Sequence, residues 1–331
     1  HNVSIHLMFL QKKTYDQIVP VDIAPSSGYT SQYSNVGELK NTGVELGLNL
    51  NPVKTVSGFE WNMYLNFTKN KSEVLSISEG VDMVTIGALF GDPSIMVAVG
   101  QPYGVFYGEV DARDDEGNLL IDPGTGLLIR STEQDFYGDP NPDFISSLSN
   151  TFSFKGFSFN VLFDYRKGGD VYSNSIVSML GRGVTKDTED REKTVIIPGY
   201  YGNPNTGEPL LDGTGNKIPN VTQVSVNDLY FGESFAINAA GEWNVYDGTT
   251  YRLREVAIGY EIPKKLLQRT PFGSANISVI GRNLWYYSPN IPKYTRADLD
   301  VNGYGSSNVQ GVEYSSAPTV KRIGFNLKFT F

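Results

Sequence analysis

The last nine residues of the chain read Ile323-Gly324-Phe325-Asn326-Leu327-Lys328-Phe329-Thr330-Phe331. Large apolar side chains occupy every second position, and Gly, Asn, Lys and Thr occupy the positions between them. Side chains of a β-strand point alternately to its two faces, so this pattern predicts a strand with one apolar and one polar face. A strand of a soluble β-sandwich can alternate in the same way, so the rest of the chain has to decide between a membrane and a soluble fold.

The same alternation recurs along the chain, mostly in pairs of segments joined by short turns at 51–58, 155–156 and 263–274. The apolar rows are Val3, Ile5, Leu7 and Phe9; Val44, Leu46, Leu48 and Leu50; Phe59, Trp61, Met63, Leu65 and Phe67; Leu148, Phe152 and Phe154; Phe157, Phe159, Val161, Phe163 and Tyr165; Val256, Ile258, Tyr260 and Ile262; Ile277 and Val279. We expect about eight antiparallel strands that share one lipid-facing side, since roughly 10 residues suffice to cross a bilayer when tilted. The parity of the apolar row changes near Arg254–Glu255, which predicts a β-bulge there.

The connections alternate between these short turns and long segments at 17–40, 75–142, 168–249 and 288–318. Short turns at one end and long loops at the other are typical of outer-membrane barrels. The face opposite the apolar rows is rich in Asn, Ser, Thr and Gly, which suits a wet or plugged lumen. The sequence therefore predicts an all-β fold, an antiparallel transmembrane β-barrel with long extracellular loops.

Composition narrows the function. The 331 residues include no cysteine, which excludes disulfides and Cys-ligated metals, and only two histidines. The net charge of -9 makes a nucleic-acid-binding surface improbable, so we expect no nucleic-acid partner. His1 and His6 fit neither a Ser/His/Asp order nor an HExxH motif, so the chain is not expected to be an enzyme.

Several stretches, in this order, resemble the C-terminal half of SusC/RagA-type TonB-dependent outer-membrane transporters of Gram-negative bacteria. They cover nearly the whole chain and are 13–18 (KTYDQI), 26–29 (SSGY), 35–38 (NVGE), 41–46 (NTGVEL), 100–108 (GQPYGVFYG), 138–144 (GDPNPDF), 251–256 (YRLREV), 259–265 (GYEIPKK) and 281–284 (GRNL). Each motif is weak alone, and the set is specific.

This resemblance implies that residues 1–331 are the C-terminal portion of a large plugged barrel in the cell outer membrane, whose plug domain and N-terminal barrel strands are absent here. It implies import of an oligosaccharide (a glycan) or a peptide. Its partners would be membrane lipid, a SusD-like surface lipoprotein, and TonB reached through the missing N-terminal region.

Three loop motifs could suggest a bound ion. Asp111–Gly117 stands where the family often has an Asp-rich run, but its acids miss the alternating ligand spacing of calcium loops. Asp298–Gly303 matches half of an EF-hand loop, although Val309 replaces the Glu due at its twelfth position, and 213–217 lacks the phosphate-loop spacing. We expect no cofactor and no metal site, with calcium in the loops as the open alternative.

Loop aromatics are the candidate ligand-binding residues, because flat rings stack on sugars or grip peptides. One group is Tyr103, Phe106 and Tyr107, with packing inside the loop as the alternative; the other is Trp285, Tyr286 and Tyr287, with an interfacial girdle as the favoured alternative. Leu327, Phe329 and Phe331 form a candidate assembly signal, since the insertion machinery reads such final strands in barrels that this chain resembles. Two other functions stay open: a passive pore or small self-contained barrel, and a surface carbohydrate-binding β-sandwich.

Overall fold

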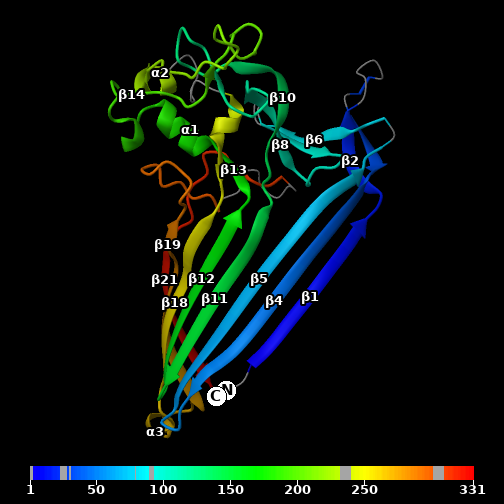
Figure 1. Ribbon diagram of the computed structural model, residues 1–331. Coiled ribbons are helices and arrows are strands. Elements are labelled where there is room, and N and C mark those ends of the chain that lie inside the picture. Colours follow the sequence, from blue (N-terminus) through cyan, green and yellow to red (C-terminus); the bar gives the residue numbers. More distant parts are fainter. Residues whose placement is uncertain are drawn as a thin grey trace.

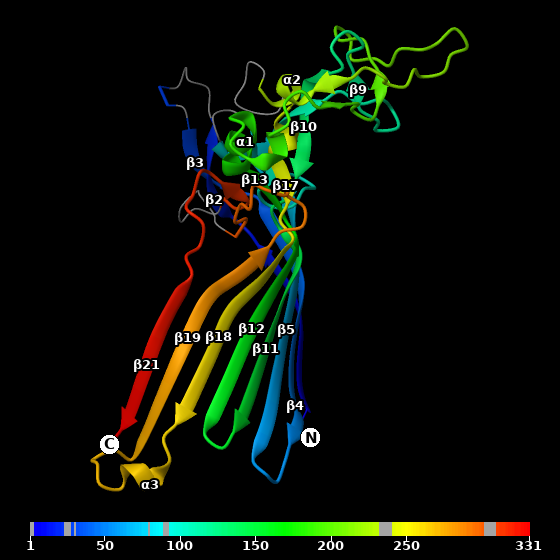
Figure 2. The same cartoon turned by 90° about the vertical axis from the view of Figure 1, so that its left-hand side faces the viewer.

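The computed structural model describes residues 3–22, 28–29, 31–78, 80–88, 93–231, 240–300 and 309–331. Its largest element is an eight-stranded sheet in which neighbours pair antiparallel in chain order (Figures 1 and 2). The strands are β1 (Val3–Thr14), β4 (Glu38–Lys54), β5 (Phe59–Ser76), β11 (Pro142–Phe154), β12 (Phe157–Gly168), β18 (Thr250–Glu261), β19 (Ser274–Tyr287) and β21 (Arg322–Thr330). The eight predicted antiparallel strands are confirmed.

The strand register places the predicted apolar rows on one face, here called the outer face. Across the sheet Leu48 pairs with Leu65, Leu65 with Leu148, and Leu148 with Phe163. Partners in register point to the same side, so the rows of all eight strands share this face. Among the described residues no second sheet covers it: Ile5, Phe163 and Phe325 are 62%, 44% and 81% exposed. A soluble sandwich would bury such side chains, so the exposed outer face argues against that alternative.

Two irregularities occur where the parity of the apolar row changes in β18, one in β18 and one in its neighbour β19. Leu162 and Phe163 of β12 are adjacent, yet they pair with Glu255 and Leu253, so Arg254 is the extra residue of a bulge. The sequence predicted this bulge. In β19 the pairing jumps from Arg282 to Trp285, and Asn283 there has a left-handed φ of 51°.

The short turns and the long segments lie at opposite ends of the sheet, as predicted (Figure 1). At the turn end are the β4–β5 and β11–β12 turns and the connection through α3 (Lys264–Leu267). Within the described residues β1 and β21 are the outermost strands and have one neighbour each, so the sheet is open. The predicted closure into a barrel stays a prediction. Among the described residues no helix has both the length and the apolar character needed to cross a membrane.

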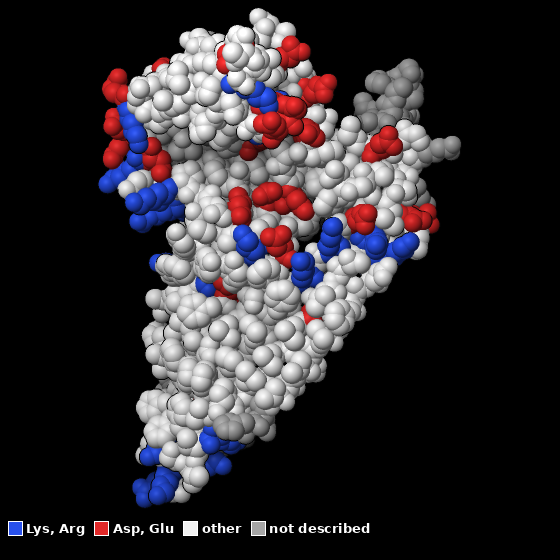
Figure 3. Space-filling model, viewed as in Figure 1, with Lys and Arg blue, Asp and Glu red and all other residues white. Residues whose placement is uncertain are grey.

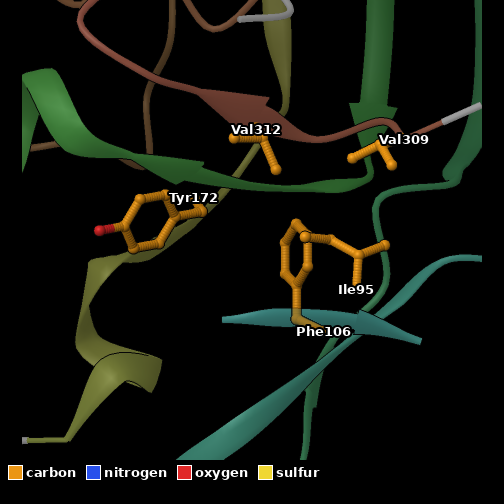
Figure 4. Packing of buried hydrophobic residues seen from close by; sticks show 5 residues of the cluster. All are labelled: Ile95, Phe106, Tyr172, Val309 and Val312. Carbon is orange, nitrogen blue, oxygen red and sulfur yellow. The ribbon is translucent and has the colours of Figure 1, made fainter. Parts of the chain in front are cut away.

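The long segments at the loop end are more ordered than the sequence suggested. Their elements are β2 (Gln17–Asp22), β3 (Ser31–Val36), β6 (Met83–Ala88), β7 (Ser94–Ala98), β8 (Val105–Asp111), β9 (Leu120–Ile121), β10 (Arg130–Gly138), β13 (Asp170–Ser173), α1 (Asn174–Gly181), η2 (Lys186–Thr188), β14 (Thr194–Val195), β15 (Tyr200–Tyr201), β16 (Val224–Ser225), α2 (Val226–Tyr230), η3 (Gly241–Asn244), β17 (Val245–Asp247) and β20 (Val312–Glu313). Strands β10, β8, β7 and β6 form a second sheet. Here Phe106 and Ile95 pack against a segment from near the C-terminus; Figure 4 shows the whole cluster, Ile95, Phe106, Tyr172, Val309 and Val312.

The distribution of charged side chains also differs between the middle of the large sheet and its two ends. On the face seen in Figure 3, the middle of the large sheet carries very few Lys, Arg, Asp or Glu side chains. Charged groups gather at the loop end, and basic groups gather at the turn end, where α3 and the residues after it supply Lys264, Lys265 and Arg269. An uncharged band between two charged ends fits a surface that faces hydrocarbon.

Candidate functional site

The polar face of the sheet, here called the inner face, carries an ion network beside the loop end. Arg252 lies on β18 and is 4% exposed, and its guanidinium binds Asp298. The Thr319 hydroxyl donates to the same carboxylate over 2.6 Å. Burial alone would raise the pKa of Asp298, but the hydrogen bonds from Arg252 and Thr319 outweigh it and hold the pKa below its ordinary value. This network ties the segment after β19 to the inner face.

A second arginine extends the network. Arg254, the extra residue of the β18 bulge, binds Asp164 of β12 and reaches Asp300 over 2.8 Å. Positions 252 and 254 are two residues apart, so strand alternation places both arginines on the inner face, and the bulge adds Glu255, which pairs with Leu162, to that face. The sequence analysis missed these arginines as site residues; the available signal was two arginines at alternate positions on the polar face of the strand.

Tyr103 lines a hollow of about 190 Å³ together with Gly104, Pro140, Asn141 and Gln310. The hollow brings together two of the sequence motifs, 100–108 and 138–144. The Asn141 amide donates to the Tyr103 carbonyl over 3.1 Å and to Asp139 over 2.7 Å, and the Tyr103 N–H donates to Ser72. These bonds fix the hollow against the loop end of β5, so it is a preformed hollow with one ring and two amide side chains in its lining.

The Phe106 side chain lies in the loop-end core, whereas the Tyr107 side chain lines a hollow. The Phe106 side chain is 0% exposed and belongs to the loop-end core (Figure 4), which supports the packing alternative for this residue. Tyr107 contacts the Phe136 ring at 5.0 Å and lines another hollow, which is polar and measures about 650 Å³, with Glu109 and Arg130. Tyr103 and Tyr107 therefore remain candidate ligand-binding rings, and they line two different hollows.

Trp285, Tyr286 and Tyr287 are divided between the two faces. Trp285 pairs with Leu253 and Tyr287 with Tyr251, so both lie on the outer face, where they are 50% and 53% exposed. Tyr286 lies on the inner face, beneath the Arg252 guanidinium, which is 5.1 Å from its ring centre.

The two outward rings end a row of aromatic contacts across the loop end of the sheet, formed by Phe67, Phe144, Tyr165, Tyr251, Tyr287 and Trp285. A second set lies near the turn end, with contacts between Trp61 and Phe152, Phe152 and Phe159, and Phe157 and Tyr260. From Phe157 to Tyr165 the strand advances ~26 Å along its axis, which at the usual tilt spans ~20 Å of height, most of a lipid-facing band. This arrangement supports the girdle alternative for Trp285 and Tyr287.

The three residues of the candidate assembly signal share the outer face at the turn end. Phe329 pairs with Ala275 and Leu327 with Ile277. The Phe331 ring is 87% exposed and lies 5.3 Å from the Phe272 ring, which also contacts Phe329 at 4.7 Å. One edge of β21 is bonded to β19, and its other edge has no strand partner among the described residues.

The acidic loop at 111–117 binds protein groups. Burial raises the pKa of Asp111 to about 6, although Trp243 and the Ala240 N–H donate to its carboxylate. Asp114 accepts hydrogen bonds from Asn118 and, over 2.8 Å, from the Lys217 ammonium, which lowers its pKa. In the part of the chain that the structure describes, no group of three or more acids or histidines is arranged for a metal. Residues 301–303 of the EF-hand-like motif lie outside that part. The same is true of Ser26 and Ser27 in the 26–29 family motif.

Sequence comparison matches the chain to TonB-dependent receptors. Receptor P3 of Formosa agariphila is 26% identical over 96% of the chain, and receptor P26 of the same organism is 27% identical over 99%. SusC of Bacteroides thetaiotaomicron is 27% identical over 45% of the chain. The chain spans about a third of receptors P3 and P26 (31% and 33%), and no family model matches it.

Structure comparison finds the fold of this chain in the RagAB transporter. The RagAB peptide transporter superposes on 99% of the chain with a TM-score of 0.67, 19% sequence identity and coverage of 33% of the matched chain. The 'open-open' state of the RagAB peptide importer matches with a TM-score of 0.64. The predicted resemblance to SusC/RagA-type TonB-dependent receptors is confirmed, and with it the localisation in the outer membrane.

Proposed function

We propose that this chain forms the C-terminal part of the β-barrel of a TonB-dependent importer for oligosaccharides or peptides. The observation that carries the proposal is the large sheet, with a continuous exposed apolar outer face and a polar inner face that holds buried ion pairs. Hydrocarbon solvates the first face and a hydrated lumen suits the second. The edges of β1 and β21 that have no strand partner among the described residues would pair with further strands of the same receptor.

The import route follows the inner face. The loops would face the outside of the cell, and Tyr103 and Tyr107 are the proposed ligand-binding rings of this chain, each beside polar groups that can orient a sugar or a peptide. A SusD-like surface lipoprotein would cover the loop end, and TonB would act through a plug outside this chain. RagAB is a peptide transporter, which supports testing peptides beside glycans.

Uptake by cells tests this function. A deletion strain complemented with the intact receptor should take up one class of labelled oligosaccharide or peptide, and removal of TonB should abolish uptake. Tyr103→Ala with Tyr107→Ala should weaken uptake, whereas Tyr260→Ala, on the outer face near the turn end, should leave it unchanged at equal outer-membrane levels. Uptake that persists without TonB would favour the passive pore instead.

A further inference from the structure

A hollow lies at the edge of β19 beside its loop end, lined by Trp285 and Tyr287 of the outer face and by Tyr286 of the inner face. It measures about 660 Å³, and its lining includes Trp285, Tyr287, Lys293, Arg296 and Lys321. Its position follows from the register. The last β19–β21 pair is Arg282 with Arg322, whereas β19 stays paired with β18 up to Tyr287. The sheet is therefore one strand narrower here, and the hollow occupies the resulting notch at the loop end of the apolar band.

Three basic side chains line this hollow beside aromatic and apolar groups. Lys293, Arg296 and Lys321 are exposed, the lining contains no acidic residue, and no ion pair found among the described residues includes any of the three. The nearby acids Asp298 and Asp300 bind Arg252 and Arg254 on the inner face. The inner-face network thus leaves an excess of positive charge at this hollow, in a chain whose net charge is -9.

We propose that this hollow binds the phosphorylated headgroup of a lipid in the outer leaflet of the outer membrane. Three cations suit phosphate oxygens, and an arginine can grip them with two N–H groups. The rings of Trp285 and Tyr287 suit the boundary between headgroups and acyl chains. Below them, Val279, Ile323 and Phe325 continue the apolar face along which the acyl chains can lie. A free phosphate ion has no apolar part to contact those side chains, whereas a lipid contacts both the cations and the apolar groups. The proposed occupant is therefore a lipid.

Lipid titration of the intact purified receptor tests this site, with diphosphoryl lipid A as the probe and native mass spectrometry as the readout. Lys293→Gln, Arg296→Gln and Lys321→Gln together should weaken lipid A binding by about ten-fold or more, since each basic group near a charged lipid surface contributes separately. The matched control is Lys264→Gln with Lys265→Gln and Arg269→Gln, three exposed bases at the turn end. It should change binding by less than about two-fold.

Three outcomes would overturn the site: unchanged binding by the loop-end triple variant, an equal loss in the turn-end control, or equally strong binding of inorganic phosphate alone. Lys321→Gln alone should give a smaller loss of lipid A binding. This single variant replaces the triple variant in the test if the triple variant does not assemble. The inference rests on the proposed barrel. Heat-modifiable gel migration of the wild-type receptor tests independently whether that barrel forms. Absence of that migration would reject the barrel; normal migration with unchanged lipid binding would reject the lipid site only.

Discussion

Arg252 on β18 and Asp298 in the segment after β19 form an ion pair whose side chains are only 4% and 1% exposed. The pair lies on the inner face, and Thr319 completes it from the segment that leads into β21. One buried contact thus joins β18 to two parts of the segment between β19 and β21. Its partners are 46 residues apart, so its formation reports that the loop has docked.

Removal of one member of this pair should loosen the loop. Asp298→Ala leaves the Arg252 charge buried, which should cost about 3–5 kcal/mol of stability. Arg252→Met combined with Asp298→Leu should cost less than the single change, because no unpaired charge remains. Lys40→Ala, which breaks a half-exposed pair with Glu73 at 3.9 Å, should cost no more than about 1 kcal/mol. Denaturant unfolding of the refolded receptor measures all three, and equal losses for Asp298→Ala and Lys40→Ala would contradict the assignment.

Asp111 should make the stability of the loop end depend on pH. Its folded pKa is raised to about 6, with burial as the main cause, above the ordinary value of 3.8. Between these values the folded state binds more protons than the unfolded state, so stability falls as pH rises from about 4 to about 6. Asp111→Asn should flatten this part of the profile. Thermal unfolding of the receptor across this pH range measures it, with exposed Glu189→Gln as the control; identical slopes for wild type and Asp111→Asn would contradict the argument.

Neighbouring residues of β21 test the two faces. Phe325 pairs with Val279 on the outer face, and Asn326 pairs with Ser278 on the inner face. Phe325→Lys places a charge against hydrocarbon and should cost about 2–4 kcal/mol, whereas Asn326→Lys should cost close to nothing in a hydrated lumen. Unfolding of the receptor in lipid vesicles gives both values. A larger loss for Asn326→Lys would reverse the orientation of the sheet.

The chain's last residue tests the assembly signal. Deletion of Phe331 should reduce insertion far more than replacement of Thr330, whose side chain is on the inner face beside Ser274. The exposed Phe331 ring shares the outer face with Phe329 and Leu327, so it belongs to the apolar row that gives the strand its register on a sheet edge. Fractionation and the heat-modifiable gel shift measure outer-membrane levels. Equal levels of the two variants would remove this role.

The sequence by itself determined the large sheet and its two faces, because the period of two is a local property that each strand carries independently. It also located the Arg254 bulge and the alternation of short and long connections. The tertiary structure alone decided the loop end, where Ile95, Phe106, Val309 and Val312 come from distant segments and no local period predicts their packing. The same holds for Arg252 and Asp298, and for the hollow of Lys293, Arg296 and Lys321: three-dimensional docking of a loop sets which charges are buried in pairs and which remain on the surface.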